Sequence, residues 1–86
     1  MSSIVFKIRK ELAQGISSIS GVEFEKIIQA VERPKNTEHG DFAFPAFLLA
    51  KTWGLPPAAC AERLCREMPL PSGVEAAKAI GPFANF

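Results

Sequence analysis

Apolar residues recur every fourth position near the start of the chain and predict an amphipathic surface helix over residues 3–19. The stripe consists of Ile4, Ile8, Leu12 and Ile16, widened by Val5 and Ile19. The basic trio Lys7, Arg9 and Lys10 lies off this stripe and is interpreted as a solvated helix face rather than a nucleic-acid contact. The helix is expected to end in the small, polar residues Ser17, Ser18, Ser20 and Gly21.

After Gly21 the pattern is interpreted as a β-strand. Between residues 24 and 31 the side chains of Phe24, Ile28 and Ala30 are expected to alternate with those of Ile27, Gln29 and Val31. Pro34 ends this run, because proline cannot donate a ladder hydrogen bond. Residues 35–40 have the polar character of a hairpin loop, so the run at 24–31 is expected to pair antiparallel with a second strand at 41–44.

The second strand is expected to lead directly into a core helix. In an extended backbone Phe42 and Phe44 share one face, with Ala43 on the other. Pro45 suits the first position of a helix, where its missing N–H costs nothing. The run 46–50 is apolar nearly all round, so this helical turn is expected to be buried.

Two helices and two strands are expected in the second half. The first helix ends at Trp53 and Gly54, with glycine in the left-handed cap position, and a second one restarts after Leu55 at the two prolines. The residues expected to point inward from it are Ala58, Ala61, Leu64, Cys65 and Met68. A strand is marked by Val74, Ala76 and Ile80, and Gly81-Pro82 turns the chain into the strand at 83–86.

These elements predict a single α+β domain over residues 1–86. The expected order is helix, strand, strand, helix, helix, strand, strand, and the expected architecture is two-layered, with the helices on one face of an antiparallel sheet. Eighty-six residues are enough for one small core.

Charge and cysteine content narrow the function classes. Ten Lys and Arg residues against nine Asp and Glu residues give a net charge of +1, so the chain lacks the general basic field of nonspecific nucleic-acid binders. Any RNA contact is therefore expected to be local. No apolar run approaches a membrane span of ~20 residues, and no signal peptide is expected. Cys60 and Cys65, five residues apart on a helix, are not expected to form a disulfide, which suits a cytoplasmic protein.

No catalytic constellation is evident in the sequence. His39 is the only histidine, and the sequence identifies neither a nucleophile nor an orienting group for it. The sequence also lacks a phosphate-binding P-loop, a dinucleotide glycine pattern and metal-ligand spacing. The chain alone is therefore expected to be non-catalytic, with no cofactor and no metal.

Four short motifs, in order, resemble the N-terminal domain of arginyl-tRNA synthetases. They are Pro34; the segment from Glu38 to Pro45; Leu49-Ala50-Lys51; and the ending from Gly81 to Phe86. The resemblance spans essentially the whole chain. It implies antiparallel strands with flanking helices, and contact with the D-loop at the outer corner of tRNA, the elbow. It also implies that ATP and arginine are bound by a catalytic domain of the parent enzyme, whose signature motifs this chain does not contain.

The resemblance places the tRNA contact in the terminal motif, where Phe83 and Asn85 match it. A phenyl ring can stack on an unpaired base, and an asparagine amide can read a base edge. Further contacts to phosphates are assigned to Lys35, Asn36 and Lys51. Ile80 stands where the family often has a polar residue. The alternative for Phe83 and Phe86 is core packing, and Phe86 is the one expected in the core.

A second function class remains open. The chain is expected to be either the tRNA-elbow-binding domain of an arginine–tRNA ligase, separated from its catalytic domain, or a docking module that packs on neighbouring domains without touching RNA. An exposed apolar patch around Phe83 and Phe86 would favour docking.

Overall fold

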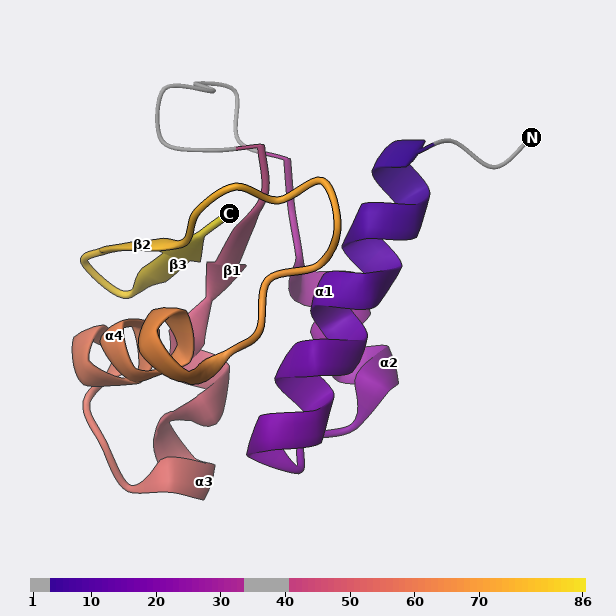
Figure 1. Cartoon of the computed structure of the whole chain (residues 1–86). Coiled ribbons are helices and arrows are strands. Elements are labelled where there is room, and N and C mark those ends of the chain that lie inside the picture. Colours follow the sequence, from indigo (N-terminus) through magenta and orange to yellow (C-terminus); the bar gives the residue numbers. More distant parts are fainter. Residues whose placement is uncertain (1–3, 34–40) are drawn as a thin grey trace.

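The computed structural model describes residues 4–33 and 41–86, which fold into helices packed around a small antiparallel sheet (Figure 1). The elements, in order, are α1 (Ile4–Ser20), α2 (Phe24–Ala30), β1 (Ala43–Pro45), the 3-10 helix η2 (Ala46–Leu49), α3 (Ala50–Trp53), α4 (Pro57–Glu67), β2 (Lys78–Ile80) and β3 (Phe83–Asn85). The predicted α+β class is confirmed. In Figure 1, α4 lies beneath the sheet, and α1 and α2 stand together beside it.

The buried residues of helix α1 include members of the predicted apolar stripe. The helix ends at serines whose hydroxyl groups form hydrogen bonds with backbone atoms. Leu12 and Ile16 are fully buried, whereas Ile4, in the first turn, is 68% exposed. The Ser20 hydroxyl donates to the Ile16 carbonyl (2.6 Å) and accepts from the Val22 amide. Gly21 then adopts a φ of 77°, a left-handed conformation that suits glycine and closes the helix.

The strand predicted at residues 24–31 is wrong: the segment forms α2. Its apolar residues at positions 24, 27, 28 and 31 have the i, i+3, i+4, i+7 spacing of a helix, and Ile27 and Val31 are the buried ones. The apparent alternation favoured the strand interpretation, but packing of this helical stripe against α1 decides the conformation.

Arg9 connects α1 to α2 and departs from the solvated face expected for the basic trio. Its guanidinium donates to the Ile28 carbonyl at 2.7 Å and to the Val31 carbonyl at 3.2 Å. Both carbonyls lie at the C-terminal end of α2, where helix carbonyls lack intrahelical partners and the helix dipole favours a cation. Arg9 is therefore a structural cap.

The predicted hairpin between residues 24–31 and 41–44 is reduced to one isolated antiparallel bridge. Glu32 and Ala43 exchange two backbone hydrogen bonds, at 2.9 and 2.8 Å. The sheet proper is built from β1, β3 and β2 in that order, so that β3 is central. The strand predicted at residues 74–80 is shorter than expected, because only Lys78–Ile80 is paired, as β2.

The shared face of Phe42 and Phe44 is confirmed, but the helix that follows them differs from the prediction. Phe42 and Phe44 are both buried, and Phe44 is the largest fully buried side chain. Pro45 ends β1 and caps η2 instead of opening the helix itself. Ala46 and Leu49, three residues apart, are fully buried, which suits the three-residue turn of a 3-10 helix. The prediction that this whole turn is buried is wrong for Phe47, which is 56% exposed.

Helices α3 and α4 are joined as predicted. Gly54 takes a φ of 66° at the end of α3, and Pro57 opens α4. The buried side of α4 consists of Cys60, Ala61 and Leu64, continued by Met68 after its end, whereas Ala58, which was expected inside, is exposed. The Arg63 guanidinium stacks 4.1 Å from the Trp53 ring centre and pairs with Glu67 at 3.2 Å.

Candidate nucleic-acid interface

The register of the sheet decides which side chains share each face. Directly opposed residues of antiparallel strands point to the same side. The row of Phe44, Ala84 and Ala79 lies on the face packed against α4, and Phe44 and Ala84 are fully buried. The neighbouring rows therefore point the other way. We call this the outer sheet face, and it consists of Ala43, Asn85 and Lys78 in one row and Pro45, Phe83 and Ile80 in the next.

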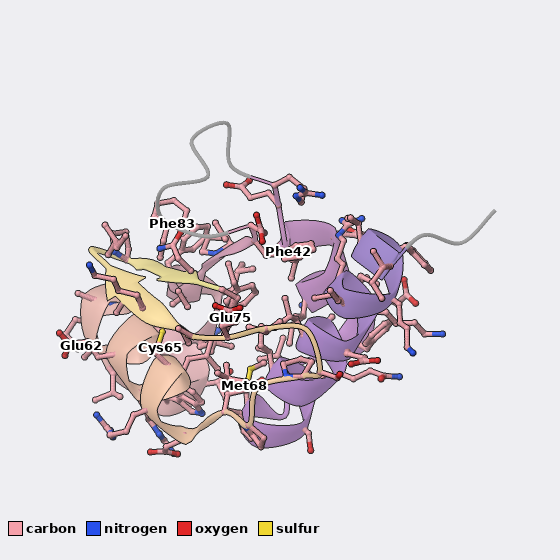
Figure 2. All side chains as sticks on the ribbon, turned by 45° about the horizontal axis from the view of Figure 1, so that its top comes forward. Phe42, Glu62, Cys65, Met68, Glu75 and Phe83 are labelled. Atoms are coloured by element: carbon pink, nitrogen blue, oxygen red, sulfur yellow. The ribbon has the colours of Figure 1, made fainter. Side chains whose placement is uncertain are left out.

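Phe83 is the exposed ring of the outer sheet face. Gly81, with a φ of 56°, makes the tight turn between β2 and β3 and brings Phe83 into the row between Pro45 and Ile80. Its side chain is 37% exposed, whereas Phe86, three residues on, is 6% exposed. Figure 2 shows Phe83 on the side of the sheet away from α4. Of the two alternatives left open by the sequence, alternation thus exposes Phe83 and buries Phe86.

Asn85 shares the outer face with Phe83 but has little surface to offer. It is 6% exposed, and its amide nitrogen donates to the carbonyls of Phe83 (3.4 Å) and Lys78 (3.5 Å). The bond to Lys78 links β3 to the facing strand β2, the bond to Phe83 stays within β3, and together they satisfy a polar group that burial would otherwise penalise. In the structure Asn85 therefore braces the hairpin that carries Phe83.

Phe47 is a surface residue that sequence reasoning missed. Its neighbours Ala46 and Leu49 are buried against α4, so Phe47, about a third of a turn further round the 3-10 helix, points away from α4. The Ala46 amide donates to the Pro82 carbonyl at 2.9 Å, which fixes this turn beside the β2–β3 hairpin. The run 46–50 is apolar throughout, so the sequence carried no signal that would single out Phe47 as exposed.

Two exposed lysines lie on the elements that carry or adjoin these rings. Lys51 is exposed on α3, four residues after Phe47, and Lys78 is exposed on β2, in the row of Asn85. Lys35 and Asn36, the other residues assigned to phosphates, lie outside the described residues, as does His39. The bridge between Glu32 and Ala43 places one exposed carboxylate at the β1 edge of the outer face, opposite the edge that carries Lys78.

A separate cavity of about 360 Å³ lies between α1, the start of β1 and the segment that precedes β2. It is lined by Ile8, Asp41, Phe42, Gly73, Val74, Glu75, Ala76 and Phe86. Phe42 and Glu75 are labelled beside it in Figure 2. Among the described residues its lining offers two carboxylates and two phenyl rings, and no serine, threonine, cysteine, lysine or histidine. Across residues 4–33 and 41–86, no three side chains of His, Cys, Asp or Glu gather closely enough to hold a metal ion.

The two cysteines are free thiols in different surroundings. Cys60 is fully buried, and its thiol lies 3.5 Å from the Leu55 carbonyl. Cys65 is half-buried and lies between α4 and the sheet in Figure 2. Burial raises the pKa of both thiols, opposed at Cys60 by the nearby Arg63 charge and at Cys65 by a backbone hydrogen bond with Asn85. Thiols kept protonated in this way are poor nucleophiles.

Comparison with known proteins places this geometry in a family. Residues 7–86 match the family model described as the arginyl tRNA synthetase N terminal domain. The chain is similar to the arginine–tRNA ligase of Lactobacillus acidophilus, with 38% identity over 91% of this chain and 14% of the ligase. It is also similar to that of Streptococcus pneumoniae, with 42% identity over 92% of this chain and 13% of the ligase.

A solved structure matches the fold over nearly the full length. The arginyl-tRNA synthetase of Thermus thermophilus superposes with a TM-score of 0.68 and 31% identity, covering 98% of this chain and 14% of that one. The chain thus spans about 14% of the length of the relatives it matches.

Within the part of the chain that the structure describes, no helix is long and apolar enough to cross a membrane.

Proposed function

The chain belongs to the family of arginyl-tRNA synthetase N-terminal domains, and on that premise we propose that it is the tRNA-contacting domain of an arginine–tRNA ligase. It meets the D-loop at the elbow of the tRNA through the outer sheet face. Since the chain spans about 14% of its relatives, ATP and arginine are assigned to the catalytic domain of the parent enzyme, which is also the expected protein partner.

The observation that carries the proposal is the exposed ring of Phe83 on the outer sheet face. The D-loop is single-stranded, and sequence-specific RNA recognition favours unpaired bases that stack on aromatic side chains. Gly81 and the pairing of β3 on both sides hold the ring in one place, so little ordering remains to be done on binding.

The other predicted contact residues take different parts in this proposal. Asn85 acts mainly by bracing the hairpin, since its amide is bound to the carbonyls of Phe83 and Lys78. Lys51, and Lys35 and Asn36 from the segment outside the described residues, are assigned to phosphates. Contacts of this kind position an RNA without reading its sequence.

The test is an NMR titration of the 15N-labelled chain with an unmodified arginine tRNA transcript at low salt. Shifts clustered at residues 81–85 are expected, together with at least fivefold weaker binding by Phe83→Ala, since one stacked base contributes roughly 1–3 kcal/mol. Shifts elsewhere only, or unchanged affinity of the variant, would contradict the proposal. A native-like spectrum of Phe83→Ala serves as the folding control.

A second candidate function, docking on another domain, rests on a different surface. An apolar groove between α1 and α2 is lined by Val5, Phe6, Arg9, Gln29, Val31, Glu32 and Arg33. Phe6, which lines the groove, is 49% exposed, and Ile4, two residues earlier on α1, is 68% exposed. The groove suits an apolar segment of a neighbouring domain. Binding of the remaining part of the parent ligase, supplied in trans, should then be lost with Phe6→Ser and kept with Phe83→Ala.

A further inference from the structure

We propose that Phe47 is a second base-stacking residue, and that the outer sheet face receives two unpaired bases of one RNA loop instead of one. The inference rests on the proposed function and deepens it, because it assigns a residue that neither the sequence motifs nor the terminal hairpin includes. It starts from the exposure of Phe47, which at 56% is greater than that of Phe83 at 37%.

The register of the sheet brings Phe47 close to Phe83, although 36 residues separate them in the sequence. Pro45 is the direct cross-strand partner of Phe83, and the next residue, Ala46, donates its amide to the Pro82 carbonyl at 2.9 Å. Phe47 is two Cα–Cα steps of about 3.8 Å from Pro45, and Pro45 is one interstrand step of about 5.5 Å from Phe83. The Cα atoms of Phe47 and Phe83 are therefore at most about 13 Å apart. The two exposed residues are therefore close enough for one RNA loop to reach both rings.

Phe47 is also held in place by its neighbours. Ala46 and Leu49, on either side of it in the 3-10 helix, are fully buried, and Ala46 is fastened to the hairpin by the bond to Pro82. A ring on such a support loses little backbone freedom when a ligand binds, which is a condition for an effective binding residue. An exposed ring on a long loop would not meet this condition.

Charge favours RNA over a protein as the occupant. Lys51 is exposed four residues after Phe47, and Lys78 is exposed in the sheet row next to that of Phe83, whereas Glu32 lies at the far edge of the outer face, beyond β1. Aromatic rings flanked by lysines form the stacking platform and backbone contacts of proteins that bind single-stranded nucleic acids. A purely apolar partner would gain nothing from the lysines.

The experiment measures the affinity of the 86-residue chain for a fluorescently labelled arginine tRNA transcript by anisotropy at low salt. Four variants are compared with the unmodified chain: Phe47→Ala, Phe47→Leu, Phe47→Trp and Phe83→Ala. Leu70→Ala is the control, because it removes an exposed apolar side chain that lies after α4 and outside the sheet. Phe47→Ala and Phe47→Leu should each weaken binding at least fivefold, Phe47→Trp should retain it, and Leu70→Ala should leave it unchanged.

The outcomes separate the inference from the proposed function. Loss of affinity with Phe83→Ala and none with Phe47→Ala overturns the role of Phe47 and leaves the proposed function standing. Loss with neither overturns both. Normal binding by Phe47→Leu shows that apolar bulk suffices, so that stacking is refuted. If Phe47→Ala instead abolishes a concentration-dependent self-association of the chain without changing RNA affinity, the ring belongs to a protein interface and the inference fails.

Discussion

At the scale of single residues, the sequence identified which residue types matter more reliably than what each of them does. Arg9 was expected in solvent and caps α2, and Asn85 was expected to read a base and is bound to two carbonyls of its own hairpin. In both cases the side chain has hydrogen-bonding capacity that either water, RNA or the backbone can satisfy. The choice depends on which groups the fold brings within about 3 Å.

Replacing Arg9 tests the capping role. Arg9→Met should lower the free energy of unfolding by about 1–3 kcal/mol, because two carbonyls at the end of α2 lose a charged donor. Urea denaturation followed by circular dichroism measures the change. Lys10→Met, which alters the exposed neighbouring residue, should stay within about 0.5 kcal/mol of the unmodified chain. Equal effects of the two substitutions would contradict the role.

The two thiols predict a pH dependence of stability. Burial raises their pKa above the ordinary value of 9.0, so the folded chain favours the protonated form more than the unfolded chain does. This contribution is complete below pH 9 and is lost as the pH rises through the higher pKa of the folded state. The free energy of unfolding should therefore fall more steeply from about pH 8 to about pH 10 in the unmodified chain than in Cys60→Ala/Cys65→Ala. Parallel pH profiles would refute this.

At the scale of elements, the spacing of apolar residues predicted the secondary structure correctly where it fitted only a helix. It failed where it fitted both a helix and a strand. The stripe of α1 has a single interpretation, and it is confirmed. Residues 24–31 carry apolar groups compatible with both a strand and a short helix, and the helix is realised because α1 offers Ile27 and Val31 a common apolar surface. A seven-residue helix would be marginal alone, so only its tertiary contact could decide.

Two glycines should respond to alanine with opposite signs. Gly15 lies inside α1, where alanine gains about 1 kcal/mol of helix propensity, and its new methyl would meet only the flexible end of Met68, at 3.3 Å. Gly15→Ala should therefore be neutral or stabilising. Gly54 has a φ of 66° and open space around it, so Gly54→Ala should lose about 1–2 kcal/mol from backbone strain alone.

Urea denaturation of both glycine variants checks these signs. Gly54→Asn is the matched variant for the strain argument, because asparagine tolerates the left-handed conformation better than alanine and should lose less stability. A loss with Gly15→Ala as large as that with Gly54→Ala would show that Met68 cannot give way in the packed core.

At the scale of the whole molecule, a net charge of +1 limits how strongly any RNA can be attracted. If Lys35, Lys51 and Lys78 each contact one phosphate, the slope of log K against log salt should be about −2.1 to −2.7. Affinity for the tRNA transcript should then fall roughly 20- to 40-fold between 50 and 200 mM salt. Anisotropy titrations at four salt concentrations measure the slope, and Lys78→Ala should reduce it by about a third. A slope steeper than about −4 would indicate a basic surface elsewhere.

The sequence by itself determined what local chemistry decides. The α1 stripe, the left-handed cap at Gly54, the turn at Gly81 and the shared face of Phe42 and Phe44 follow from spacing and backbone preference, and the ordered motifs identified the family.

Only the tertiary structure decided that residues 24–31 are helical, that Arg9 is a cap, that Phe47 is exposed and that Asn85 is buried. Local patterns record which side chains are apolar, but burial is a property of pairs of surfaces. Each of these four features depends on a partner that lies 7 to 36 residues away in the sequence or on another element. The partner is α1 for residues 24–31, the end of α2 for Arg9, the β2–β3 hairpin for Phe47 and the facing strand β2 for Asn85.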